Sequence, residues 1–359
     1  MVHFVLLVAC AVVIYLSCEW FVNAVEWLGQ RLNVGKMAVG TILAAFGTAL
    51  PESVVTLVAV TTGGSDEAKD IGVGAAMGGP LALATVAYAV TGVALLMRRR
   101  KLAASVPASG GPSGQGDTGR GQSEVLTDPV HAARLVKDQR WFLAVFVFKV
   151  ALGLVAFAFK PWLGLVFFAT YAVYFWREMR GGDEAAAALE GEHEEDDALE
   201  PLKMQPRRAA PATWAVAVQT LVTLVVIFFA SQLFVHQLDA IGPMIGLPAA
   251  VTALLLSPIA TELPEIMNAI IWVRQGKLKL ALANISGAMM IQATVPSGLG
   301  LLFTAWKFDG ALAWAGLMTM VAIVYLLATM RAHRLTPARL AFAGVFYLVF
   351  AAGLVPILN

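Results

Sequence analysis

The sequence predicts an all-α integral membrane protein of about ten transmembrane helices, arranged as two inverted-topology five-helix repeats with broken helices at the midplane. Three observations support this fold class: long apolar runs, a one-sided distribution of Lys and Arg, and an internal repeat. Of the 359 residues, 59% are hydrophobic and 14% are charged, whereas soluble domains average roughly 25% charged residues. Runs of about 20 apolar residues have the length that an α-helix needs to cross a bilayer.

Ten apolar runs are expected to form the membrane-spanning helices. In chain order they are residues 3–30, 36–62, 69–97, 140–159, 161–178, 212–235, 247–273, 279–304, 309–330 and 338–357. The first run has no Lys or Arg ahead of it and keeps its helical pattern past Glu19. We therefore expect a retained first span rather than a signal peptide.

Two polar stretches interrupt these runs. Residues 99–138 begin within a run of four basic residues and are rich in Gly, Ser and Pro, a composition typical of a flexible loop. Residues 179–211 contain a strongly acidic run and are interpreted as a solvated linker loop. We therefore assign residues 1–178 to the first five-helix repeat and residues 212–359 to the second.

The basic residues predict how the chain is oriented. Of the 25 Lys and Arg residues, 21 fall in alternate loops that share one side of the membrane. These loops are residues 31–36, 98–140, 177–208, 274–279 and 331–339. By the positive-inside rule, the large loops are cytoplasmic and both termini lie outside the plasma (inner) membrane. Five spans in each half then give the halves opposite orientations, and the net charge of +1 predicts no nucleic-acid partner.

The two halves are also related in sequence. A displacement of 213 residues aligns them over more than thirty positions without a gap, and it places residues 48–52 (TALPE) on residues 261–265 (TELPE). Inverted repeats with helices interrupted near the membrane midplane are an architecture of many secondary transporters. The repeat therefore indicates transport and points to these two motifs as the site.

Three acids, Glu52, Glu262 and Glu265, lie deep in the apolar runs. An ionised carboxylate at the bilayer centre costs at least about 2.5 kcal/mol on insertion scales. Such acids need a compensating role, and binding a cation or a proton supplies one.

The surroundings of these acids predict hard oxygen ligands. In each motif a Thr lies four residues before the final Glu, so that the two share a helix face. A Pro directly before that Glu has no N–H for the carbonyl four residues earlier, which leaves this carbonyl available for coordination. The ion-binding residues predicted in this way are Gly47, Thr48, Glu52, Ala260, Thr261, Glu262, Glu265, Asn284 and Gln292. Such oxygens suit Ca²⁺ or Na⁺ rather than soft metals; the two amides either add ligands or hydrogen-bond across helices.

The motifs at residues 40–52 and 257–265 resemble the two signature repeats of the cation/calcium exchanger superfamily, in particular the prokaryotic sodium/calcium exchangers. The resemblance covers mainly residues 19–97 and 232–304. It implies ten spans with both termini outside, and Ca²⁺ and Na⁺ bound at the midplane by two carboxylates that follow Pro. The positions that match the metal ligands of the family are Thr48, Glu52, Thr261 and Glu265.

The sequence departs from the pattern of the family at several positions. Many members have Ser after the Thr of both motifs, where this chain has Ala49 and Glu262. Members also carry polar ligands in the third and eighth spans, where this chain has Gly79, Leu83 and Ala288. These changes leave the full set of Na⁺ sites open, and Glu262 adds a charge that compensates for them.

The function expected from these patterns is secondary active cation antiport by alternating access, most simply Ca²⁺ exchanged for Na⁺ or H⁺. The partners are the lipid bilayer and inorganic cations, no cofactor is expected, and the sequence carries no signal for an oligomeric state. A monovalent cation/proton antiporter and a transport-inactive, ion-sensing protein of the same fold are the alternatives. An intramembrane protease is disfavoured, because none of the five His residues lies in an H-E-x-x-H motif and no span carries paired Asp residues.

Overall fold

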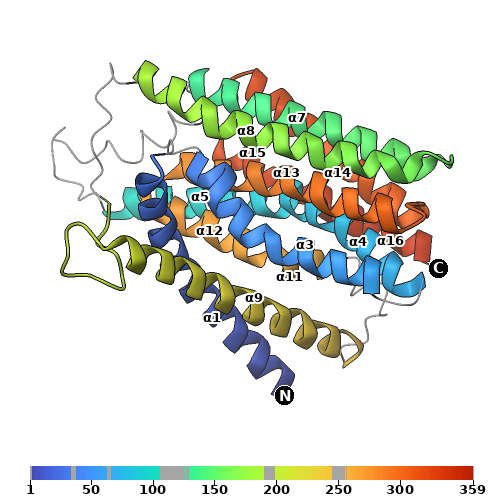
Figure 1. The fold of residues 1–359 in the computed structure, drawn as a ribbon, viewed down its shortest axis with the longest axis horizontal. Coiled ribbons are helices and arrows are strands. Elements are labelled where there is room, and N and C mark those ends of the chain that lie inside the picture. The colour runs from blue at the N-terminus through green and yellow to red at the C-terminus, as the bar shows by residue number, and fades with distance from the viewer. Residues whose placement is uncertain are drawn as a thin grey trace.

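The computed structural model (Figure 1) describes residues 2–33, 38–62, 66–105, 126, 129–189, 199–244, 255 and 257–358. Within these residues every regular element is a helix, which confirms the all-α prediction. The α-helices are α1 (Val2–Arg31), α3 (Ala45–Thr62), α4 (Asp66–Ala82), α5 (Tyr88–Ser105), α7 (Pro129–Leu154), α8 (Gly164–Leu189), α9 (Thr213–Met244), α11 (Ser257–Thr261), α12 (Leu263–Gln275), α13 (Leu278–Phe303), α14 (Gly310–Arg331), α15 (Pro337–Phe342) and α16 (Gly344–Leu358). The π-helices η1 (Val39–Ala44) and η2 (Leu83–Ala87) and the 3₁₀-helix η3 (Lys160–Leu163) complete the set.

All ten predicted spans contain helix in their described parts. Among the described residues, six helical segments are long and apolar enough to cross a membrane by length and composition. They are Val2–Arg31, Gly72–Lys101, Thr213–Phe234, Leu278–Phe303, Gly310–Arg331 and Pro337–Ile357. The count of ten spans and the inverted relation of the halves stay predictions.

Helix extends into both predicted loops. The end of α5 and the start of α7 occupy the two ends of residues 99–138, and α8 continues to Leu189, inside residues 179–211. The loop prediction was therefore wrong at these ends. Residues 183–189 (DEAAAAL) are mostly strong helix formers, which explains why α8 outlasts its apolar run.

Several helix ends follow from local sequence. Asp309 caps α14 by accepting a hydrogen bond from the Leu312 N–H at 2.7 Å, and Thr336 caps α15 in the same way. Gly276 ends α12 in the left-handed region, at φ 90°, a conformation that favours glycine. These caps separate α12 from α13 and α14 from the last helices.

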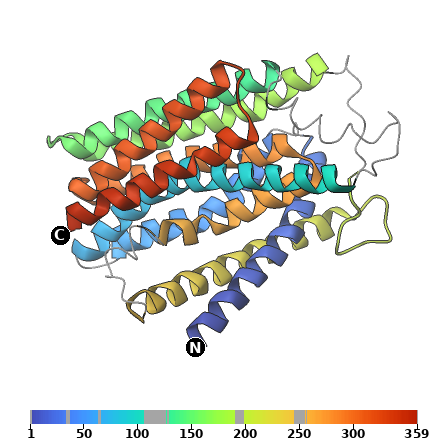
Figure 2. The same ribbon diagram turned by 180° about the vertical axis from the view of Figure 1, so that it is seen from behind.

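The helices form an elongated bundle whose core contains α13. Figures 1 and 2 show α7 and α8 along one edge and the pair α1 and α9 along the opposite edge. Helix α13 packs against α3, α4, α7, α8 and α12. Both chain ends lie toward the end of the bundle away from the 199–212 loop (Figure 1).

Small residues let α13 approach the first motif closely. A Cβ at Gly40 in η1 would lie 2.8 Å from the Cβ of Ala283, and a Cβ at Gly287 would overlap the backbone of Thr41. Close approach through small residues is a common way to pack helices in lipid. The crossing of η1 and α13 therefore depends on these glycines.

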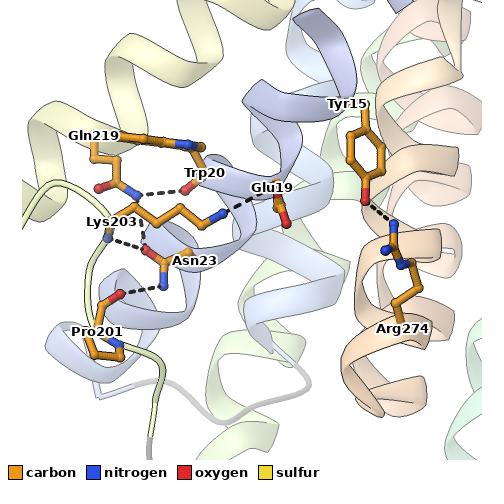
Figure 3. Close-up of polar contacts among 8 residues, drawn as sticks. All are labelled: Tyr15, Glu19, Trp20, Asn23, Pro201, Lys203, Gln219 and Arg274. Atoms are coloured by element: carbon orange, nitrogen blue, oxygen red, sulfur yellow. Dashed lines mark hydrogen bonds and ion pairs between the residues drawn. The ribbon is translucent and has the colours of Figure 1, made fainter. Parts of the chain in front are cut away.

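The 199–212 loop binds α1 and α9 together, as Figure 3 shows. The Asn23 Oδ1 accepts hydrogen bonds from the Lys203 N–H at 3.0 Å and from Gln219 Nε2 at 3.2 Å. Gln219 Nε2 also donates to the Trp20 carbonyl at 2.9 Å, and Lys203 Nζ lies 3.4 Å from Glu19. This part of the predicted linker is thus tied closely to the helices.

Polar contacts also join α1 to α12 and to the turn before α13. Glu26 is buried, and its carboxylate accepts hydrogen bonds from Trp272 Nε1 at 2.9 Å and Lys277 Nζ at 2.5 Å. Further along α1, the Tyr15 hydroxyl accepts a hydrogen bond from Arg274 (Figure 3). These contacts anchor α1 to the helix that carries the second motif.

Candidate functional site

The second motif lies at a break in the helix. Helix α11 ends at Thr261 and α12 begins at Leu263, and Glu262 between them has φ −83° and ψ 6°. The Glu262 N–H donates to the Pro258 carbonyl at 3.2 Å, and the Glu262 carbonyl accepts from the Ile266 N–H at 3.1 Å. Helical hydrogen bonds therefore hold the backbone of Glu262 on both sides of this one-residue break.

The first motif has a different backbone. Helix α3 passes through residues 48–52 without a break, and the π-helix η1 directly precedes it. The sequence prediction of two broken helices was therefore wrong for this half. Local π adjustments can accommodate a proline within a membrane helix, and here the irregular turn lies upstream of Pro51. The side chains of Pro51 and Glu52 lie outside the described residues.

Both predicted threonines make hydrogen bonds within their own helices. The buried Thr48 hydroxyl donates to the Ala44 carbonyl at 3.0 Å, and the partly buried Thr261 hydroxyl donates to the Pro258 carbonyl at 3.1 Å. A hydroxyl that donates its hydrogen keeps two lone pairs as acceptors. Each threonine oxygen thus keeps lone pairs with which it could accept a further contact; the role of both as cation ligands stays a prediction.

The two acids of the second motif are completely buried. Glu262 and Glu265 are both 0% exposed. Asn284 on α13, also buried, donates from Nδ2 to the Glu265 carbonyl at 3.3 Å. Its own Oδ1 has no hydrogen-bond partner within the described part of the chain. The predicted residues Glu265 and Asn284 therefore meet between α12 and α13.

Glu262 and Gln292 meet at Gly79 on α4. A Cβ at Gly79 would lie 2.5 Å from Oε1 of Glu262 and 3.2 Å from Oε1 of Gln292. The adjacent Gly78 lies directly against Pro258, whose Cγ would be 2.5 Å from a Cβ at that position. The structure thus brings the extra acid and the predicted amide of α13 onto one stretch of α4 backbone.

The structure also shows a buried amide that the sequence analysis missed. Asn268 lies one turn after Glu265 on α12 and is completely buried. Neither polar atom of its side chain has a hydrogen-bond partner among the residues described. A polar residue three positions after Glu265, within an apolar run, was the available signal.

The described residues contain no group of three or more His, Cys, Asp or Glu placed to share a metal ion. They do contain two buried carboxylates, Glu262 and Glu265, and three buried amides, Asn268, Asn284 and Gln292, on α12, α13 and the break between α11 and α12. The predicted carbonyl donor Ala260 is buried at the end of α11, and Gly47 lies one turn before Pro51 on α3. Such a set of oxygen atoms suits a hard cation that is bound transiently.

Comparison with known proteins places these features in context. The sequence model of the sodium/calcium exchanger protein family matches residues 2–179 and 215–355. A curated relative from Alkalimonas amylolytica, named "Putative antiporter CaxA", is 23% identical over an alignment of 349 residues that covers 94% of this chain and 95% of that protein.

The fold also matches solved structures of the sodium-calcium exchanger NCX_Mj. A structure soaked with Na⁺ and Ca²⁺ gives a TM-score of 0.69 at 16% identity and covers 99% of both chains. A structure soaked with zero Na⁺ and Ca²⁺ gives a TM-score of 0.66 at 17% identity, over 98% of this chain and 97% of the other. At these identities the likeness shows a shared fold.

Proposed function

The chain belongs to the sodium/calcium exchanger family, and from this premise we propose that it exchanges Ca²⁺ for Na⁺ or H⁺ by alternating access. It is an integral membrane protein of a cation antiporter family. The observation that carries the choice of Ca²⁺ is the pair of completely buried carboxylates, Glu262 and Glu265, at the break between α11 and α12. A divalent cation bound beside these carboxylates would offset much of the cost of burying them.

The proposed site combines oxygen atoms from both halves of the chain. The second half supplies Glu262 and Glu265 with the Thr261 hydroxyl, the Ala260 carbonyl and the amides of Asn284 and Gln292. The first half supplies the Thr48 hydroxyl, the Gly47 carbonyl and the Glu52 carboxylate. Ca²⁺ takes six to eight such oxygens, so the site has enough ligands for a dehydrated ion.

The proposed topology has ten spans in two inverted repeats, residues 1–178 and 212–359, joined by the linker 179–211. Both termini lie outside and the large basic loops are cytoplasmic. Two observations support this: the one-sided distribution of Lys and Arg, and the position of both chain ends away from the 199–212 loop (Figure 1).

Uptake of ⁴⁵Ca²⁺ into proteoliposomes tests the proposal. Liposomes are loaded with Na⁺ in one arm and made acidic inside in the other. Wild-type protein is compared with Glu265→Gln and with the control Glu200→Gln, which changes an exposed side chain in the 199–212 loop. We expect Glu265→Gln to lower uptake about tenfold or more, since a charged ligand is lost, and Glu200→Gln to behave as wild type.

Two outcomes would contradict the proposal. Full uptake by Glu265→Gln would remove this acid from the site. No uptake in either arm by folded wild-type protein would exclude Ca²⁺ exchange. In that case, ²²Na⁺ flux would identify a monovalent cation/proton antiporter, and thermal protection by Ca²⁺ without any flux would identify an ion-sensing protein.

A further inference from the structure

The contact between Gly79 and Glu262 determines what α4 contributes to the site. A Cβ at Gly79 would lie 2.5 Å from Oε1 of Glu262, whereas non-bonded carbon and oxygen atoms need roughly 3.3 Å. A side chain at position 79 and the present position of the Glu262 carboxylate therefore exclude each other.

The close atom is the end of the Glu262 side chain, so a side chain at position 79 would turn the carboxylate away while the backbone of residue 262 stays in place. The Glu262 backbone is held by hydrogen bonds to Pro258 and Ile266 at 3.2 and 3.1 Å. The adjacent Gly78 lies against Pro258. A Cβ built at Gly78 would lie 2.5 Å from Cγ of Pro258. At these two glycines the backbone of α4 thus packs against the side chains of Pro258 and Glu262.

This stretch of α4 offers no side-chain oxygen to a cation. Gly78, Gly79 and Pro80 have none, and the next three residues, Leu81, Ala82 and Leu83, are apolar and completely buried. The oxygens beside α4 come instead from Glu262 and from Gln292, whose Oε1 would be 3.2 Å from a Cβ at Gly79. A negative carboxylate therefore occupies the volume that a neutral side chain on α4 would fill.

We propose that Gly79 and Glu262 act as a pair that sets cation specificity: the glycine makes room for the Glu262 carboxylate, which takes the volume that an α4 side chain would fill and favours divalent over monovalent ions. Affinity for Ca²⁺ rises with the number of charged ligands. Na⁺ gains less, because a single charge is attracted to an added carboxylate about half as strongly as a double charge at the same distance. The inference rests on the proposed cation exchange and names the residues that tune it.

The test uses four variants: Gly79→Ser, Glu262→Ser, the double variant, and the control Gly74→Ser. Gly74 lies on the same helix and a Cβ there meets no atom within 4 Å. Each variant is purified, its folding is checked by thermal unfolding, and ⁴⁵Ca²⁺ uptake is measured in proteoliposomes with increasing external Na⁺.

We expect Gly74→Ser to match wild type and Gly79→Ser to lose at least about tenfold in uptake or fail to fold. Glu262→Ser should raise the KM for Ca²⁺ about tenfold or more and lower the Na⁺ concentration that inhibits uptake. The double variant should fold and take up more Ca²⁺ than Gly79→Ser alone, with the same increased sensitivity to Na⁺.

Three outcomes would overturn the inference while the wild type still transports Ca²⁺. They are uptake by Gly79→Ser equal to that of Gly74→Ser, additive losses in the double variant, and an unchanged preference for Ca²⁺ over Na⁺ in Glu262→Ser. Failure of the wild type to transport Ca²⁺ would instead refute the proposed function.

Discussion

Replacement of Gly287 by Ala tests the close crossing of α13 and the first motif. A Cβ at Gly287 would lie 2.7 Å from both the Cα and the carbonyl carbon of Thr41. Carbon atoms need at least about 3.5 Å, so one of the two backbones must move by about 1 Å. No side-chain rotation can relieve the overlap, because every close atom belongs to the main chain.

The expected magnitude combines two opposing effects. Overpacking of this kind costs about 1–3 kcal/mol, and the higher helix propensity of Ala returns about 1 kcal/mol. The matched control is Gly74→Ala on α4, where a Cβ meets no atom within 4 Å and only the propensity gain remains. The two variants should therefore differ by about 2 kcal/mol in the free energy of unfolding.

The assay is the apparent melting temperature of the purified proteins in detergent, followed by tryptophan fluorescence. We expect Gly287→Ala to melt about 5 °C below Gly74→Ala, by the usual relation for larger domains. If Gly287→Ala melts at or above the temperature of Gly74→Ala, the two backbones do not approach as closely as the structure has them.

Two further predictions concern charged groups away from the site. Glu26→Gln should lower the apparent melting temperature by a few degrees, because its contact with Lys277 at 2.5 Å stabilises the fold by about 1–2 kcal/mol. Adding Lys277→Met should lower the melting temperature little further, since the contact is already lost. If the losses of the two single variants add fully in the double variant, the two side chains do not interact. Asp138 precedes the predicted span 140–159, and burial together with ionised Glu178 raises the pKa of Asp138 to about 8. The folded protein then keeps a proton that the unfolded chain releases near pH 4, so stability falls by roughly 1.4 kcal/mol per pH unit as pH rises toward 8. Asp138→Asn should therefore raise the melting temperature more at pH 8.5 than at pH 5.5, and equal effects at both would contradict the pKa.

The apolar runs predicted where helices lie, because a backbone in lipid must satisfy its hydrogen bonds within the segment. The run lengths therefore located helix in all ten ranges. They could not predict the polar extensions, because those segments are not apolar. The start of α7 is joined to the middle of α8 by an ion pair between Arg134 and Glu178 at 2.7 Å. These residues are distant in sequence, and nothing in either local pattern indicates the pairing.

For the site, too, the sequence predicted the residues of the motifs but not the backbone that surrounds them. The motifs TALPE and TELPE share their Thr, Leu, Pro and Glu, and the sequence therefore predicted the same broken helix twice. The structure has a break only at Glu262, while residues 48–52 continue as helix behind η1. Because both motifs contain Pro, the proline alone does not explain why only the second motif breaks its helix. The second motif differs in its surroundings: Pro258 and Glu262 lie against Gly78 and Gly79 of α4. The sequence identified the acids, but only the fold shows that the glycines of one half make room for the extra acid of the other.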